Sequence, residues 1–454
     1  MNTQSRMNLK SIFRIEMMLV FIGSISFAQN PLIQDQFTAD PSARVFGDRV
    51  YVFPSHDILA TEGKGRKDWF CMEDYHVFSS VNLTDWTDHG MIVQQNKVPW
   101  VKPDSYSMWA PDCIERNGKY YFYFPSTPKD TINSKRGFKV GVAIANKPEG
   151  PYIPEPNPIK GISGIDPNVF IDKDGQAYLY WSGGNIFVAK LKENMTELDS
   201  EVKTIENLPT KGLKEGPYLF ERNGIYYLTY PHVENKIERL EYATADNPLG
   251  PFKVAGVIMD ESPTGCWTNH HSIIEFKKQW YLFYHHNDLS PQFDKARSIR
   301  ADYLHFNPDG SIQKVIPTLR GVGITKATNP IQIDRYLKIS DKGSSISFLD
   351  SSNSFKGWKT TFNQSDAWVQ YNSVDFGQKK LKSISIKAFS EKGGVLQVCT
   401  KGIGQTVLAE VKIPKGSKWQ EVKSPVLKFD SGVQDVFVVS KNNNQVEVDW
   451  VKFE

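Results

Sequence analysis

Short runs in which aromatic and aliphatic residues alternate recur through the first two thirds of the chain, and each run follows a tight-turn dipeptide. Asn117-Gly118 precedes such a run at residues 120–125, and Asn223-Gly224 precedes another at residues 226–231. Asn-Gly between alternating apolar runs is a strong hairpin signal, because both central residues of a type I′ turn need positive φ. The pattern recurs at residues 49–54, 177–182 and 280–285, so the sequence predicts five β-hairpins.

The spacing of these hairpins indicates the fold class. The copies recur at roughly 50 to 70 residues, which is typical of four-stranded propeller blades rather than of helical repeats. We therefore expect an all-β protein with a five-bladed β-propeller over residues 29–335. Short alternating strands about every ten residues then predict a second domain, a jelly-roll-like β-sandwich over residues 340–454. The preceding stretch contains Pro and Gly without a clear period and is the expected linker.

Composition and the N-terminus narrow the functional classes. The 454 residues are 13% aromatic and 23% charged, with a net charge of +3 and no basic stripe that would select nucleic acid. Residues 17–28 form an apolar run too short to span a bilayer, and Ser26 and Ala28 stand at the spacing of a cleavage site. This predicts a signal peptide over residues 1–28 and a secreted or periplasmic protein without membrane contact after cleavage. The four scattered cysteines reveal no pairing.

Acidic residues or a histidine stand just before the first strand of each predicted hairpin. If every blade starts in the same way around a central axis, these side chains meet at one end of it. Hydrolysis of a glycosidic bond needs a carboxylic acid to protonate the leaving oxygen and a carboxylate on the other face of the sugar. A third carboxylate raises the pKa of the acid by like-charge proximity. The converging residues are Asp40, Asp112, Asp166, Glu215 and His270.

Structural roles compete with catalytic ones at these positions. Asp-Pro and Glu-Gly-Pro are ordinary turn openers, but their recurrence at one repeat position favours chemistry for Asp40, Asp166 and Glu215. Asp112 is either a substrate contact or a hydrogen-bond acceptor that joins blades. His270 is either a core residue or a neighbour of an ion on the axis. Trp109 and Trp267 lie outside the hairpin runs and are candidates for stacking on sugar faces.

The motifs in order along the five blades are Asp-Pro, Trp-Ala-Pro-Asp, Ile-Asp-Pro, Glu-Gly-Pro and His-x-Ser. This order resembles glycoside hydrolase family 43, whose five-bladed propellers act on xylans and arabinans. The resemblance implies that Asp40 is the general base, Glu215 the general acid, and Asp166 the residue that orients Glu215 and tunes its pKa. It also implies inversion in one step, a structural calcium ion near His270, and a sugar contact by Arg297. No organic cofactor is implied.

The second domain resembles a family 6 carbohydrate-binding module. The resemblance rests on residues 366–371, on Lys418-Trp419-Gln420, and on the closing Val448-Asp449-Trp450. It implies a sugar contact by Trp419, for which a core position is the alternative. Glu447 stands where such modules often carry a sugar-binding asparagine.

These features together predict an inverting glycoside hydrolase that acts on plant cell-wall glycans, namely xylan, arabinoxylan or arabinan. We expect an exo-acting β-xylosidase or α-L-arabinofuranosidase. Xylose and arabinofuranose can present similar hydroxyl positions to one pocket, so the sequence does not separate these two activities. An endo-arabinanase on the same fold is the enzymatic alternative. A non-catalytic glycan-binding propeller is the alternative from another class, and it would be expected to lack at least one of the three carboxylates.

Overall fold

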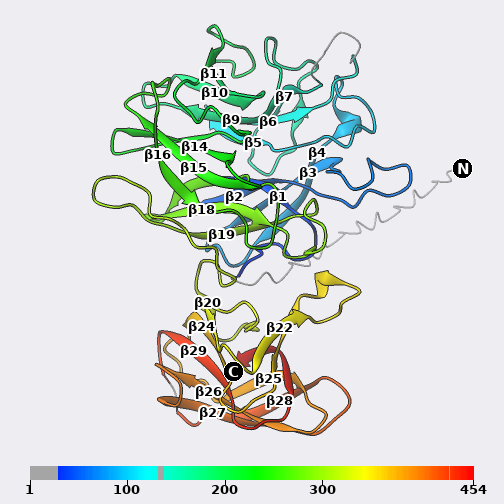
Figure 1. Ribbon diagram of the computed structural model, residues 1–454, viewed down its shortest axis with the longest axis vertical. Coiled ribbons are helices and arrows are strands. Elements are labelled where there is room, and N and C mark those ends of the chain that lie inside the picture. The colour runs from blue at the N-terminus through cyan, green and yellow to red at the C-terminus, as the bar shows by residue number, and fades with distance from the viewer. Residues whose placement is uncertain (1–28, 131–136, 429) are drawn as a thin grey trace, which may run out of the picture.

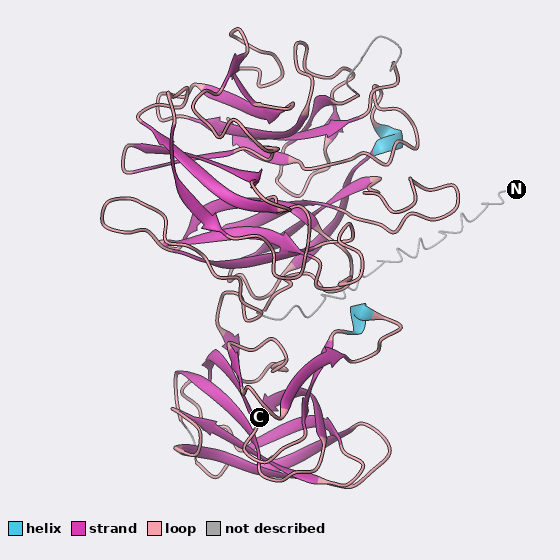
Figure 2. Cartoon of the chain, in the orientation of Figure 1, coloured by secondary structure: helices cyan, strands magenta, loops and turns pink. Residues whose placement is uncertain are grey.

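Five antiparallel sheets follow one another along the first two thirds of the protein (Figure 1). The computed structural model describes residues 29–130, 137–428 and 430–454, so the predicted signal peptide lies outside the described residues. Figure 2 shows strands and loops almost throughout. Within these described ranges, two short 3₁₀ helices lie at Gln95–Lys97 and Ser354–Lys356. No helix in the described residues is long and apolar enough to cross a bilayer. The sheets confirm the predicted five-bladed propeller.

Each blade pairs its strands in sequence order. Blade one contains β1 (Ala39–Phe46), β2 (Arg49–Ser55), β3 (Asp74–Ser80) and β4 (Thr87–Gln94); blade two contains β5 (Asp112–Arg116), β6 (Lys119–Ser126), β7 (Lys139–Ala145) and β8 (Ile153–Pro154). Blade three contains β9 (Ile165–Ile171), β10 (Ala177–Ser182), β11 (Ile186–Leu191) and β12 (Lys203–Thr204); blade four contains β13 (Tyr218–Arg222), β14 (Ile225–Val233), β15 (Glu238–Ala245) and β16 (Lys253–Met259). Blade five contains β17 (Ser272–Phe276), β18 (Gln279–His286) and β19 (Ser298–Leu304).

The predicted turn chemistry explains the hairpins. Asn117 and Gly118 have φ of 53° and 74°, and Asn223 and Gly224 have φ of 53° and 83°. Both central residues of each turn are thus left-handed, as a type I′ turn requires. The turn fixes the register across it, so that Arg116 pairs with Lys119 and the pairing continues along β5 and β6.

The apolar core lies between adjacent blades, in five clusters that follow the ring. Successive residues of a central strand face opposite neighbours, as the period of two dictates. Phe122 packs between blades one and two, whereas Tyr123 packs between blades two and three. The same holds for Leu228 and Tyr227 on β14. Because both faces of each central strand are buried, the second strand of every hairpin is aromatic and apolar at nearly every position.

The N-terminal segment closes the ring by running along the last strand of blade five. The backbone N–H of Leu32 donates to Ile299 O at 2.9 Å, and the N–H of Thr38 donates to Arg297 O at 3.0 Å. Asn30 donates through its side chain to Ala301 O at 3.1 Å and accepts from Ala301 N at 2.9 Å. This closure places the start of β1 beside the start of β19.

Asp112 joins three blades near the axis. Its side chain is buried and accepts hydrogen bonds from Ser42 Oγ at 2.6 Å and Arg44 Nε at 3.0 Å in blade one. In blade three it accepts from Asn168 Nδ2 at 3.0 Å and from Val169 N at 2.7 Å. Every one of these contacts is structural, so the geometry favours the blade-joining alternative for Asp112.

The C-terminal part forms two packed sheets around one apolar core, as the predicted β-sandwich requires (Figure 1). One sheet has the order β20 (Thr325–Lys326), β24 (Trp368–Asp375), β29 (Val433–Ser440), β26 (Gly394–Thr400) and β27 (Thr406–Ile413), with β21 (Lys338–Ile339) also paired to β24. The other has the order β22 (Ser344–Phe348), β23 (Trp358–Phe362), β30 (Val446–Phe453), β25 (Ser383–Phe389) and β28 (Gln420–Pro425).

The stretch interpreted as a linker contributes to the sandwich. β20 pairs in parallel with β24, and Ala327, Ile331 and Ile333 are buried in the sandwich core. The backbone N–H of Ile331 also donates to Val451 O at 2.7 Å. The sandwich therefore starts near residue 325, before the expected boundary, because these residues pair with a strand far along the chain rather than with their neighbours.

The two domains share a small apolar cluster. Trp358 of the sandwich packs with Phe37, Leu289 and Ala296 of the propeller. The guanidinium of Arg335 lies 3.8 Å from the centre of the Trp358 ring, a close cation–π contact. Hydrogen bonds from Gln29 to Gln332 and from Arg320 to Asn372 O accompany the cluster.

Substituting Asp112 by Asn tests its structural role. The change leaves Arg44, whose side chain is only 12% exposed, without its carboxylate partner, and breaking such a buried pair costs about 3–5 kcal/mol. We expect a lower midpoint of urea unfolding with little change in KM at temperatures where the variant is folded. Asp48→Asn, at an exposed turn, is the matched control. A variant with unchanged stability and a raised KM would instead assign Asp112 to substrate binding.

Candidate active site

The first strands of the blades begin around one pocket with a volume of about 200 Å³. The pocket brings together the three predicted catalytic carboxylates, both predicted stacking tryptophans, His270 and Arg297. Asp112 is absent from this lining, and Trp419 lies in the other domain. The lining consists of Asp40, Trp69, Phe70, Met72, Trp109, Ala110, Ile165, Asp166, Glu215, Glu238, Trp267, Thr268, His270 and Arg297.

Asp40 sits in a left-handed conformation at an irregularity of β1. Its φ is +46°, and the β1–β2 register shifts between Ala39 and Ser42. Ser55 Oγ donates to Asp40 Oδ2 at 2.7 Å, and Arg297 Nη1 donates to Oδ1 at 2.7 Å. Burial by itself raises the pKa of Asp40, but the positive charge of Arg297, with smaller effects from two histidines and Ser55, lowers it to about 2. Asp40 is therefore a buried carboxylate that stays ionised.

Arg297 is held by a second buried carboxylate. Its Nε and Nη2 donate to the two oxygens of Asp57, each at 2.9 Å, which gives the bidentate geometry of a strong arginine–carboxylate pair. The Phe70 ring lies 4.9 Å from the guanidinium, and Nη1 also donates to Thr268 Oγ1 at 3.2 Å. These partners fix Arg297 at the pocket, with Nη1 directed at Asp40.

The environment of Glu215 favours the protonated form of its carboxyl group, whereas that of Asp40 favours the ionised form. Burial raises its pKa well above the ordinary value, and the nearby carboxyl of Glu238 raises it further through charge and a hydrogen bond. Asp166, at φ +56°, accepts from Gly216 N at 3.1 Å and so contacts the backbone directly after Glu215. The pKa of Asp166 is also raised, first by burial and then by Glu215 and Asp40.

Glu238 is a site residue that sequence reasoning missed. It begins β15, is 1% exposed, and accepts from Asn269 N at 2.7 Å. Burial raises the pKa of Glu238 to about 7, although the hydrogen bond with Glu215 lowers it. Glu238 begins the third strand of its blade and follows other charged residues, so it does not share the repeat position before a first strand. Its position gave no periodic signal.

Gly216 permits a close approach at the same place. Its φ is +52°, and a Cβ there would lie 3.1 Å from Pro231 and 3.2 Å from His270 Cε1. The pKa of His270 is lowered, chiefly by burial. Among the described residues its ring nitrogens have no hydrogen-bond partner. His270 thus contributes a neutral, uncommitted imidazole to the pocket lining.

Aromatic rings form the pocket wall. Trp109 packs against Phe138 and Phe70, with ring centroids 4.5 and 6.0 Å apart. The backbone oxygen of Trp267 accepts from Glu238 N at 3.0 Å, which ties this wall to the acidic side of the site. Trp69 is 39% exposed at the rim.

The sandwich has a pocket of its own, of about 480 Å³. Trp419 is half-buried and lies next to that pocket, with its ring centroid 6.1 Å from that of Phe389 in the lining. Glu447 also lines the pocket, and Lys359 Nζ donates to its carboxylate at 2.8 Å. The other lining residues are Asn363, Glu391, Lys392, Asn443, Asn444 and Gln445.

Comparisons with known proteins agree with this geometry. The sequence profile of glycosyl hydrolases family 43 matches residues 28–312, and that of the carbohydrate binding module of family 6 matches residues 340–454. The chain is 38% identical to xylosidase/arabinosidase 43A of Humicola insolens, over 62% of this chain and 98% of the relative.

Two solved structures extend the comparison. A family 43 β-xylosidase/α-arabinofuranosidase from a compost microbial metagenome, in a complex with xylotriose described as the calcium-free form, matches with a TM-score of 0.57 at 35% identity. This match covers 64% of this chain and 98% of that protein. An arabinoxylan arabinofuranohydrolase of Bacillus subtilis matches with a TM-score of 0.56 at 25% identity, over 93% of this chain and 97% of that protein. The chain therefore belongs to glycosyl hydrolases family 43 and carries a family 6 carbohydrate-binding module at its C-terminus.

Proposed function

We propose that this protein is an inverting, exo-acting glycosidase that releases xylose or arabinofuranose from the ends or branches of xylan-derived glycans. Its similarity to xylosidase/arabinosidases supports a glycoside hydrolase of the β-xylosidase or α-L-arabinofuranosidase type. The observation that carries the proposal is the opposite electrostatic environment of two carboxyl groups in one pocket. Asp40 is kept ionised by Arg297, whereas burial and then the neighbouring carboxyl groups favour the protonated form of Glu215.

The reaction follows from these two states. Asp40 accepts a proton from a water molecule as the water oxygen forms its bond to the anomeric carbon. The glycosidic C–O bond breaks in the same displacement, and Glu215 gives its proton to the leaving oxygen. Asp166 positions Glu215 by accepting a hydrogen bond from the Gly216 N–H, and the two neighbouring carboxyl groups disfavour each other's ionised form.

The pocket favours a single sugar. Its volume of about 200 Å³ is below the roughly 300–1,000 Å³ of pockets that enclose drug-sized ligands. Trp69, Phe70 and Trp109 supply flat apolar surface for a sugar face. An endo-arabinanase would need an open groove along several sugars. A non-catalytic glycan-binding propeller would not require all three carboxylates at one pocket.

A calcium ion near His270 is part of the proposal. Its neutral imidazole has no other partner among the described residues and suits a metal ligand, but the neighbouring oxygen donors are already engaged. Asp40 is bound by Arg297 and Ser55, and Asp112 by Arg44. The site thus fits an ion whose remaining ligands are water, and such an ion would add positive charge at the pocket lining.

The sandwich is proposed to hold the enzyme on plant cell-wall polysaccharide such as arabinoxylan. The aromatic pair of Trp419 and Phe389 lies next to a polar pocket, a combination suited to stacking and hydrogen bonding with sugars. The predicted signal peptide supports a secreted or periplasmic location, where such polymers are met.

Two measurements test the function. Aryl β-D-xylopyranoside and aryl α-L-arabinofuranoside should be cleaved, and NMR of the first product should show inversion of the anomeric configuration. Retention of configuration would exclude the direct displacement by water. Release of internal fragments from arabinan, without cleavage of either aryl substrate, would favour the endo-arabinanase.

Acid and base roles can be separated by leaving group. Glu215→Gln and Asp40→Asn should each lower kcat on xylobiose by roughly 100- to 10,000-fold, because each deletes one half of the proton transfer. An activated aryl leaving group needs little protonation, so Glu215→Gln should retain far more activity on it than Asp40→Asn. Equal losses on both substrates would contradict the assignment.

The pH profile tests the contribution of Glu238. Glu238→Gln removes a negative charge and supplies an amide donor, and both changes stabilise the ionised form of Glu215. The pKa of Glu215 should fall, so the alkaline limb of kcat/KM should move to lower pH. Glu275→Gln, which removes an exposed charge, is the control. If the alkaline limbs of Glu238→Gln and the wild-type protein coincide, Glu238 does not set the pKa of the acid.

Polymer binding tests the sandwich. In affinity gels with xylan, Trp419→Ala in the inactive Glu215→Gln background should bind about tenfold more weakly, equivalent to roughly 1.4 kcal/mol. Leu427→Ala, which removes an exposed apolar side chain of the same domain, should have no effect. Unchanged retardation of the Trp419 variant would assign polymer binding to another surface.

A further inference from the structure

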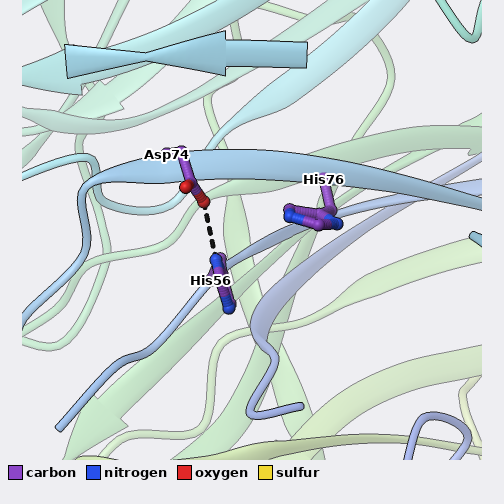
Figure 3. A group of neighbouring side chains, drawn as sticks. All are labelled: His56, Asp74 and His76. Carbon is purple, nitrogen blue, oxygen red and sulfur yellow. Dashed lines mark hydrogen bonds and ion pairs between the residues drawn. The ribbon is translucent and has the colours of Figure 1, made fainter. Parts of the chain in front are cut away.

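Two histidines and an aspartate meet outside the active-site pocket, at the junction of β2 and β3. His56 directly follows β2, Asp74 begins β3, and His76 lies two residues further on that strand. Their ligand atoms all lie within 4.8 Å of one another. Figure 3 shows the three side chains facing a common space, with His56 bonded to Asp74. Their side chains are 20%, 13% and 19% exposed, so the group is enclosed but reachable from solvent.

The orientation of His76 is that of a metal ligand. Its Nδ1 lies 3.2 Å from both oxygens of Asp88, and because a carboxylate only accepts, Nδ1 is the donor. In the neutral ring this leaves the lone pair on Nε2, which has no hydrogen-bond partner among the described residues. Asp88 is itself fixed by Gln36 Nε2 at 3.1 Å and by Gly90 N at 2.7 Å. Metal-binding histidines are oriented by such carboxylates.

The donor set indicates the class of cation. Two imidazole nitrogens and one carboxylate suit a borderline divalent ion such as Zn²⁺, with Co²⁺ as its spectroscopic substitute. A set in which two of the three protein ligands are imidazoles suits Ca²⁺ and Mg²⁺ less well, because both prefer oxygen ligands. A cation here replaces the proton between His56 Nδ1 and Asp74 Oδ1, which lie 2.6 Å apart, and that proton passes to solvent.

We propose that His56, Asp74 and His76 form a Zn²⁺-class cation site that joins the two ends of the loop at residues 57–73. This loop supplies Trp69, Phe70 and Met72 to the pocket. It also carries Asp57, which follows His56 in sequence and holds Arg297 in its bidentate pair. The cation thereby fixes the base of a loop that shapes one wall of the pocket. The proposal stands on these ligands and does not depend on which sugar the enzyme releases.

Metal content tests the site directly. Purified full-length protein, stripped with a chelator and then dialysed against Zn²⁺, should retain one ion per chain by mass spectrometry. His76→Gln and Asp74→Asn should each weaken binding by at least about tenfold, and Asp88→Asn by roughly 10- to 100-fold. His305→Gln, at an exposed histidine, is the matched control and should bind as the wild type does. Co²⁺ should give visible d–d absorption in the wild-type protein and lose it in His76→Gln.

Proteolysis tests the link to the loop. Lys64, Arg66 and Lys67 are exposed tryptic sites within the loop. Zn²⁺ should slow cleavage at these residues in the wild type and in His305→Gln, but not in His76→Gln. The absence of Zn²⁺ uptake, or equal uptake by His76→Gln and His305→Gln, would overturn the proposal. Uptake that depends on His270 and not on His76 would overturn it as well, since it would place the ion at the axis.

Discussion

The guanidinium of Arg297, bound between the buried carboxylates of Asp40 and Asp57, is the interaction on which the site depends. Asp40 and Asp57 belong to the first blade in the sequence, whereas Arg297 directly precedes β19, the last strand of the last blade. They meet only because the N-terminal segment pairs with β19 and closes the ring. Loss of either carboxylate would leave a buried charge without its partner, which is strongly destabilising, so the closure of the fold and the ionisation of Asp40 are properties of one junction.

The ion pair of Arg297 and Asp40 also makes the two sides of the pocket electrostatically different. On the Arg297 side, positive charge outweighs the penalty of burial and keeps Asp40 ionised. On the opposite side, Asp166 and Glu238 are buried beside the partly buried Glu215 without a comparable cation, so the pKa values of all three carboxyl groups are raised. The one positive charge of Arg297 lies beside some of these five carboxyl groups and away from the others. This difference in electrostatic environment separates the proposed base from the proposed acid. An additional carboxyl group such as Glu238 strengthens that asymmetry without changing the positions of the reacting residues.

The features that repeat from blade to blade were predictable from the sequence. Turn dipeptides such as Asn117-Gly118 identified the hairpins, and their spacing gave five sheets and the convergence of Asp40, Asp166 and Glu215. Interactions between non-repeating segments were not predictable. Asp57 lies in the β2–β3 loop, outside the repeated hairpin pattern, and residues 325–333 join the sandwich through pairing with distant strands rather than through a local period. The sequence left two interpretations of Asp112, and its hydrogen-bond partners in blades one and three distinguish between them.

The sandwich also bears on the catalytic junction. Trp358 covers Phe37 and Ala296, which lie three residues before Asp40 and directly before Arg297. Removal of the sandwich would expose these side chains next to the strand pairing that closes the ring. Phe37 and Ala296 therefore owe part of their apolar cover to the sandwich. The carbohydrate-binding module therefore acts as a brace on the end of the propeller where Asp40 and Arg297 meet, in addition to any affinity it has for polymer.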